Sequence, residues 1–195
     1  NFFSHIGPAC PICGASDCYR EISPYWRYAI ELFPKFKKKQ VPIARFLCRR
    51  RWRTFSLLPI QLIPYFQYTV SAVIGTLLMG FRSWQMSQKG FYGATQSVHP
   101  DSDITPYLVF CWLAGVVRGL RRGHATLKRF YDLSCVRSIE GTGLWEKVAS
   151  YFLAFGWKPE VRWGPLLMTL LRRYSHVTTQ FLFGTASQQR NVIRH

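Results

Sequence analysis

The stretch "FLCRRRWRTF", from Phe46 to Phe55, has the form of half a metal-binding knuckle in which one residue differs. A zinc ribbon would place a second cysteine three residues after Cys48, and this chain has Arg51 at that position. Two interpretations follow from this difference. Either a metal site takes its fourth ligand from elsewhere in the chain, or no metal is bound and the functional residues of the segment are its arginines.

A second cysteine group, "CPICGASDC", supplies three further thiols near the start of the chain. The two-residue spacer of Cys-Pro-x-Cys-Gly lets both thiolates reach one ion, and the glycine permits the tight backbone behind them. Tetrahedral zinc takes four such ligands at about 2.3 Å. The sequence therefore predicts a structural zinc ion held by Cys10, Cys13, Cys18 and Cys48, with His5 as the reserve ligand. The alternatives are a degenerate ribbon that folds without metal and, less favoured, a redox pair.

The charge of the chain is its strongest compositional feature. It has 195 residues, with 26 lysines and arginines against 9 acidic residues, which gives a formal net charge of +17. Hydrophobic residues make up 48% of the sequence, enough to build a core. A globular chain this basic is typical of proteins that bind a polyanion. We expect DNA or RNA as the partner, and a basic subunit resting on an acidic protein is the alternative.

The positive charge is densest between Arg20 and Arg53, where eleven lysines and arginines face two acids. Guanidinium groups hold phosphates with paired hydrogen bonds, and an interleaved tryptophan stacks on bases or covers the surface. The predicted phosphate-binding patch comprises Lys37, Lys38, Lys39, Arg49, Arg50, Arg51, Trp52 and Arg53. A second candidate stripe comprises Arg118, Arg121 and Arg122. The structural alternative for the first patch is a solvated basic hairpin.

Together, "CPICG" and "VPIARFLCRRRWRTFSLLP" resemble the amino-terminal zinc ribbon of bacterial insertion-sequence transposases and their stand-alone relatives. The second half of that ribbon typically reads Arg-Tyr-x-Cys-x-x-Cys-x-x-Thr-Phe-Ser. The matching positions here are Arg45, Phe46, Cys48, Thr54, Phe55 and Ser56, while Arg51 departs from the pattern. The resemblance covers residues 8–64 and implies nucleic-acid binding, with Arg45 among the basic residues of the ribbon. It also implies a helix-turn-helix region, for which residues 69–120 are the expected place.

The overall organisation predicted is α+β and mostly helical. A basic zinc-ribbon-like module spans residues 1–58, a helical body spans 59–184, and a frayed tail spans 185–195. In the module, Val41–Leu47 is expected to pair with Arg53–Leu57, with Lys37–Lys39 in the connecting loop. In the body, helices are expected from Thr69 to Gln88, from Pro106 to about Leu120, from about Leu144 to Phe155, and from Pro165 through Tyr174.

A membrane-spanning segment is the least favoured organisation. The 28 residues from 54 to 81 carry no charge, but Pro59 and Pro64 interrupt them and the second half has a one-sided apolar stripe. The apolar run from 104 to 117 covers 14 residues, too few to cross a bilayer. No charged-then-apolar signal peptide opens the sequence, so a cytoplasmic, nucleic-acid-associated location and no membrane partner are expected.

The helical body is expected to supply a DNA-binding fold, a surface for self-association or a face for a protein partner. The segment "PYLVFCWLAGVV" is apolar where a groove-reading helix would be polar and basic, so a core helix is favoured there. No catalytic set stands out among the acids and histidines, and a non-enzymatic function is expected. The alternatives are an RNA-binding subunit of a ribonucleoprotein complex and a truncated transposase or nuclease.

Overall fold

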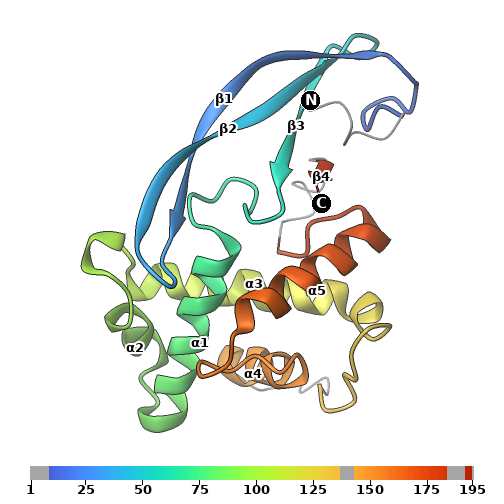
Figure 1. Cartoon of the computed structure of the whole chain (residues 1–195). Helices are drawn as coiled ribbons and strands as arrows, with labels where there is room; N and C mark the ends of the chain where they lie inside the picture. The colour runs from blue at the N-terminus through green and yellow to red at the C-terminus, as the bar shows by residue number, and fades with distance from the viewer. Residues whose placement is uncertain (1–8, 137–142, 184–191, 195) are drawn as a thin grey trace.

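The computed structural model describes residues 9–136, 143–183 and 192–194, in which a curved β-sheet arches over a layer of helices (Figure 1). The first three strands precede all the helices in the chain, and the last strand returns to the sheet. The α+β class predicted from the sequence is confirmed by this arrangement.

The sheet is built around one long antiparallel hairpin. Its strands are β1 (Tyr19–Glu31), β2 (Lys37–Cys48), β3 (Arg53–Pro59) and β4 (Val192–Arg194), in that spatial order. In the β1–β2 pair, Tyr19 lies opposite Cys48 at one end and Glu31 lies opposite Lys37 at the other. β3 continues the antiparallel pairing, with Phe55 opposite Phe46, whereas β4 is parallel to β3. Most of the tail predicted to fray lies outside the described residues.

The strand predictions are confirmed only in part. The expected pairing of Val41–Leu47 with Arg53–Leu57 is present, since β2 and β3 pair through this region. The prediction that Lys37–Lys39 form a connecting loop is wrong, because these lysines are the first residues of β2. They pair with the last residues of β1, a 13-residue strand that the sequence did not predict.

The helices are α1 (Val70–Ser87), α2 (Gly90–Gln96), a short 3-10 helix (Pro100–Ser102), α3 (Pro106–Leu127), α4 (Leu144–Ala154) and α5 (Trp163–Thr178). The four helices expected from the sequence are present and begin within two residues of their predicted positions, whereas α2 and the short 3-10 helix were not predicted. Thr69 caps α1 by accepting a hydrogen bond from the backbone N–H of Ala72. Thr105 caps α3 in the same way, because its side chain accepts a hydrogen bond from the backbone N–H of Leu108.

The main core lies between the helices. α3 contributes a buried stripe that includes Trp112 and Leu113, and α1 and α4 meet it with Leu77 and Phe152. The prediction of a core helix at "PYLVFCWLAGVV" is confirmed for the positions of this stripe. α3 continues seven residues beyond its predicted end at Leu120.

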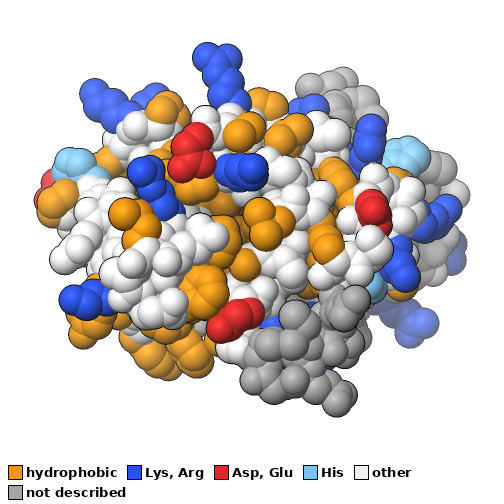
Figure 2. All heavy atoms as spheres, turned by 90° about the horizontal axis from the view of Figure 1, so that it is seen from below, with side chains coloured by type: hydrophobic (Ala, Val, Ile, Leu, Met, Phe, Trp, Pro, Cys, Tyr) orange, Lys and Arg blue, Asp and Glu red, His pale blue; other side chains and the backbone are white. Residues whose placement is uncertain are grey.

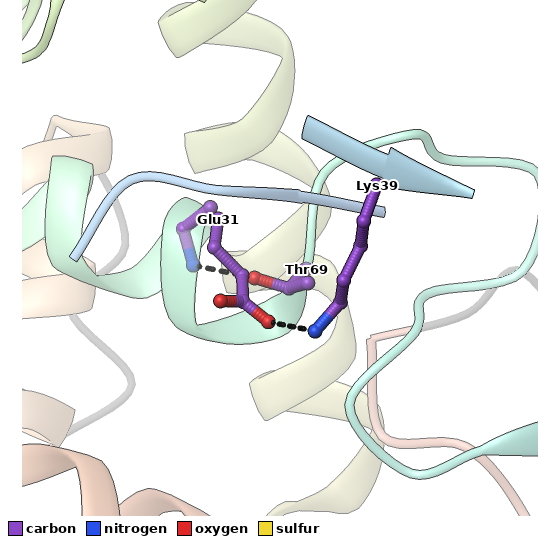
Figure 3. A network of polar contacts seen from close by, with 4 residues as sticks. Glu31, Lys39 and Thr69 are labelled. Atoms are coloured by element: carbon purple, nitrogen blue, oxygen red, sulfur yellow. Dashed lines mark hydrogen bonds and ion pairs between the residues drawn. The ribbon is translucent and has the colours of Figure 1, made fainter. Parts of the chain in front are cut away.

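The tip of the β1–β2 hairpin is docked on the helical layer. Ile30 of β1 accepts a hydrogen bond from the N–H of Thr69 and donates its own N–H to the carbonyl of Gln67, at 3.0 and 2.8 Å. Phe33 packs edge-on against Trp163 of α5, with ring centroids 6.2 Å apart. Glu31 and Lys39 form an ion pair beside Thr69 (Figure 3). The hairpin is therefore anchored where α1 begins.

The face of the molecule away from the hairpin is of mixed character. Figure 2 shows lysines and arginines scattered there among hydrophobic and uncharged side chains. Among the described residues, no helix has both the length and the apolar character that crossing a membrane requires.

Candidate metal centre and nucleic-acid interface

Four cysteines meet at the end of the hairpin farthest from the helices. The sulfur atoms of Cys10, Cys13, Cys18 and Cys48 all lie within 4.8 Å of one another. The Cys18–Cys48 and Cys13–Cys48 separations are 3.8 and 3.7 Å, and the Cys13–Cys18 separation is 3.1 Å. Sulfurs bound to one tetrahedral zinc at about 2.3 Å would lie about 3.8 Å apart. The four predicted ligands are thus close enough to hold one metal ion. His5, the reserve ligand, lies outside the described residues.

The first knuckle forms as its sequence predicts. The N–H of Gly14 donates to the carbonyl of Cys10 at 2.8 Å, which closes the turn that brings Cys10 and Cys13 together. Gly14 has a φ angle of +74°, in the left-handed region that favours glycine.

The second half of the site keeps the backbone of a knuckle although Arg51 replaces the cysteine. Trp52 follows Arg51 as Gly14 follows Cys13, and Trp52 also has a positive φ angle, +50°. A non-glycine residue in this region costs about 1 kcal/mol. Cys18 occupies the place of the missing thiol. It directly precedes Tyr19, the first residue of β1, and Tyr19 lies opposite Cys48, so the pairing of the two strands brings Cys18 next to Cys48.

A small core supports the cysteines from within the sheet. Phe46 and Phe55, opposite each other on β2 and β3, are stacked with centroids 5.4 Å apart. Tyr19 packs edge-on against both rings. Cys10, Cys18 and Cys48 are buried against this aromatic group. The cluster is therefore closed to solvent on most sides, as in structural rather than catalytic metal sites.

The surroundings of the thiols shift their acidities in opposite directions. A backbone hydrogen bond at Ala15, followed by the Cys18 thiol, lowers the pKa of Cys13 to about 7. Burial raises the pKa of Cys18 well above its usual value. A metal cation at the centre would favour the thiolate form of both residues.

Beside the cysteines lies the basic turn, which we define as Arg49 to Arg53. Its backbone is tied to the cluster, since the N–H of Arg49 donates to the carbonyl of Cys18 at 2.8 Å. All five side chains are exposed, and the Trp52 ring is 76% exposed. Among the described residues, no carboxylate forms an ion pair with the arginines of this turn.

A cavity of about 440 Å³ opens between the first knuckle and the basic turn, lined by Ile12, Arg51 and Arg53. Arg51, which takes the place of a ligand, therefore lines an arginine-rich hollow next to the cysteine cluster. Ile12 gave no signal in the sequence, because it is a spacer residue whose position depends on the fold of the knuckle.

The structure divides the patch predicted from the sequence. Lys37, Lys38 and Lys39 lie at the docked end of β2, ten residues from the cysteine end, which at about 3.3 Å per residue is roughly 30 Å. Lys39 is paired with Glu31 at 2.7 Å. Arg45 lies between the two ends, half-buried, opposite Ile22 and Ser56. The prediction of one continuous patch is therefore corrected to two separate basic surfaces.

The second predicted stripe lies on the helical body. Arg118, Arg121 and Arg122 are exposed on α3, and Arg122 donates a hydrogen bond to the carbonyl of Leu182 at 3.1 Å. Arg122 therefore also has a structural role, because its hydrogen bond joins α3 to the segment that follows α5.

A nuclease site would need acidic residues that lie close together, but the described acidic residues that follow the cysteine module are spread over the fold. Asp101 lies in the 3-10 helix, Asp132 accepts a hydrogen bond from the N–H of Ser134, and Glu160 pairs with Arg82. Within the described ranges, the four cysteines are the only group of three or more potential metal ligands that come together. Glu140 lies outside the described residues.

Comparisons with known proteins add no family to this description: no family model, curated protein or solved structure matches the chain. The fold and the site therefore define an α+β protein with a four-cysteine cluster beside an arginine-rich turn, and its function is argued from these features.

Proposed function

We propose that this chain is a nucleic-acid-binding protein, with DNA as the favoured target, in which a structural zinc ion positions the basic turn on phosphate groups. The observation that carries the proposal is the direct attachment of the basic turn to the cysteine cluster through the Arg49–Cys18 hydrogen bond. A metal held by the cysteines would fix the turn in one conformation. Its arginines would then meet a phosphate backbone without a large loss of conformational entropy.

The charge distribution supports a polyanionic partner. The arginines of the basic turn are exposed and lack acidic partners among the described residues. The hollow lined by Arg51 and Arg53 has room for a phosphate group. Because guanidinium groups bind phosphate oxygens with two parallel hydrogen bonds, this pair is suited to a backbone phosphate.

The biological setting proposed rests on the transposase resemblance: an accessory or regulatory protein of the mobile-element type. The hypothesis that the helical body contains a helix-turn-helix motif has less support. The exposed residues in the first turns of α3 include Tyr107, Phe110 and Cys111, which are not the polar and basic residues of a groove-reading helix. These exposed aromatics are better suited to a protein partner or a second copy of the chain.

Salt dependence tests the proposal. Affinity for a duplex oligonucleotide, measured by fluorescence anisotropy at several KCl concentrations, should fall with a log–log slope of roughly −4 to −5 if about five phosphates are neutralised. Changing Arg50→Ala and Arg51→Ala together should make the slope less steep by about 2.

A matched control removes two exposed cations from the helical body, Lys158→Ala and Arg162→Ala, and should leave the slope unchanged. If the affinity of the unaltered protein does not change with salt concentration, binding through phosphate contacts is excluded. Equal effects of the two double variants would show that overall charge, and not the basic turn, determines binding. Preference for structured RNA over duplex DNA would support the ribonucleoprotein alternative.

A further inference from the structure

One face of the β1–β2 hairpin displays large aromatic side chains to solvent. Trp26 lies opposite Pro42 in the register, Tyr28 lies opposite Gln40, and Ile30 lies opposite Lys38, so these six side chains share one face. Trp26 is 64% exposed and Tyr28 is 41% exposed. We call the exposed part of this face, formed by Trp26, Tyr28, Lys38, Gln40 and Pro42, the hairpin platform.

The opposite face of the hairpin is committed to the fold. Ala29 and Ile43 are buried there against Leu58 and Leu62. Arg27 on the same side donates a hydrogen bond to the carbonyl of Ile63 at 2.6 Å. These contacts fix which face of the strands points outward. The platform is therefore held rigidly by the packing behind it.

Burial in the core does not explain the aromatic residues of the platform. Antiparallel strands with one solvated face usually carry polar residues there, because exposed apolar rings contribute little to folding. The platform also carries positive charge, because the Lys38 ammonium lies over the Tyr28 ring, 5.0 Å from its centroid. Aromatic rings beside cations are the combination that binds bases together with their phosphates.

The spacing of the two rings suits successive bases. Residues two apart on a strand are separated by about 6.6 Å, which an unstacked single strand can span between neighbouring bases that each lie on one ring. Sheets that bind single-stranded RNA stack two or three unpaired bases on aromatic residues in this way. A duplex cannot use such a surface, because its bases are already stacked on each other.

We propose that the hairpin platform stacks unpaired bases of a single-stranded nucleic acid on Trp26 and Tyr28, while Lys38 holds an adjoining phosphate. This inference rests on the proposed nucleic-acid-binding function and adds a second surface to it. In this arrangement the basic turn contacts phosphates at the cysteine end of the hairpin, and the platform stacks on unpaired bases nearer the docked end of the hairpin. Lys37 and Lys39 do not belong to the platform, because they lie opposite Glu31 and Ala29 on the other face of the hairpin, where Lys39 is paired with Glu31.

The test compares ligands that share phosphates and differ in their bases. The full-length chain is titrated by fluorescence anisotropy with a 20-nucleotide thymidine strand, the corresponding uridine strand, an abasic strand of equal length, and a 20-base-pair duplex. Trp26→Ala should weaken binding of the two base-containing single strands by about 5- to 100-fold, the range expected for one lost stacking contact. Binding of the abasic strand and of the duplex should change by less than about 2-fold, because neither stacks on the platform.

Two further variants separate stacking from structural damage. Trp26→Phe keeps an aromatic ring and should recover most of the affinity for single strands. Tyr92→Ala removes an equally exposed aromatic residue, 64%, from α2 and should change nothing. Circular dichroism of each variant confirms that it has folded.

The outcomes distinguish this inference from the proposed function. If the unaltered protein binds the duplex but no single strand, the platform is excluded and the proposed function stands. If Trp26→Ala reduces the affinity for the abasic strand as much as the affinity for the thymidine strand, base stacking on Trp26 is excluded. If no nucleic acid binds at all, both proposals fail. A larger loss for uridine than for thymidine would identify RNA as the natural strand.

Discussion

The two ends of the β1–β2 hairpin are held in place by different means. At one end, four thiols converge on a space that suits a metal ion, supported by the small aromatic group around Phe46. At the other end, Phe33 and the backbone of Ile30 are fixed on the helices by packing and hydrogen bonds. If the cysteines hold the proposed zinc ion, the cysteine end depends on a bound metal, whereas the docked end is held by contacts within the chain. Changes made at either end should have separable effects.

The largest effect is expected from Cys48→Ser. Structural zinc contributes on the order of 10 kcal/mol to small metal-dependent folds, so losing one thiolate should release the metal and loosen residues before Arg53. Metal per chain, measured by mass spectrometry after purification without added metal, should fall from about one zinc to near zero. Limited proteolysis should then cut within the cysteine end while the helical circular dichroism signal persists.

Cys111→Ser serves as the matched control, because Cys111 is exposed on α3 and lies outside the cluster. Its metal content should equal that of the unaltered protein. Retention of zinc by Cys48→Ser would remove Cys48 from the ligand set. Absence of zinc from the unaltered protein would mean that the aromatic group folds this end alone.

The docked end should respond most to Gly75→Ala. A β-carbon at Gly75 of α1 would clash with the Phe33 ring and would lie 2.9 Å from the Trp163 ring, closer than such contacts allow. We expect a loss of about 2 kcal/mol in the free energy of unfolding, measured by urea denaturation, because the rings must shift. Zinc content should not change.

The same substitution at Gly115 of α3 is the control, because a β-carbon there meets no atom within 4 Å. Gly115→Ala should stabilise the protein by up to about 1 kcal/mol, since alanine favours the helix. Equal effects at the two positions would show that Phe33 is not held tightly against α1.

A smaller effect is expected from Thr69→Ala. Thr69 is 4% exposed and accepts a hydrogen bond from the buried N–H of Ala72, so its removal should cost about 1 kcal/mol. Thr105→Ala removes the equivalent cap from α3 at an exposed site, where water can replace the hydroxyl. Chemical denaturation should therefore give a larger loss for Thr69 than for Thr105, and the reverse order would contradict the buried cap.

The smallest effect is expected from Glu31→Gln, which breaks the ion pair with Lys39. Both side chains are partly exposed, 31% for Glu31 and 53% for Lys39, and such pairs contribute between 0 and 1 kcal/mol. The loss in thermal denaturation should correspond to less than about 0.5 kcal/mol and should disappear at 1 M salt. A loss above 1 kcal/mol would mean that this pair holds the docked end.

The features predicted correctly from the sequence are those set by neighbouring residues. The starts of α1 and α3 and the apolar stripe of α4 each depend on a few consecutive positions. The set of four cysteines was also proposed correctly as a cluster, because thiols at knuckle spacing restrict the choice of ligands.

The features that were missed depend on distant contacts. β1 escaped prediction because Trp26 and Tyr28 face solvent, so the strand lacks a regular alternation of polar and apolar residues. The end of α3 was placed too early, at about Leu120, whereas the helix continues through Gly123 to Leu127. In the fold, a β-carbon at Gly119 would meet the backbone of Leu182, more than 60 residues away, so the glycine permits a close approach within a continuous helix.

The two edges of the sheet also determine how this chain meets copies of itself. One edge is β4, which pairs with Leu57–Pro59 of β3 and is only three residues long, so it offers little backbone for a further strand to pair with. The other edge is β1, whose register shifts between Ile22 and Tyr25 around Pro24, a residue without a backbone N–H. An incoming strand would therefore find an interrupted ladder along β1, and edge-to-edge polymerisation is discouraged. A hairpin this long and this exposed can thus project from the helices without acting as a template for aggregation.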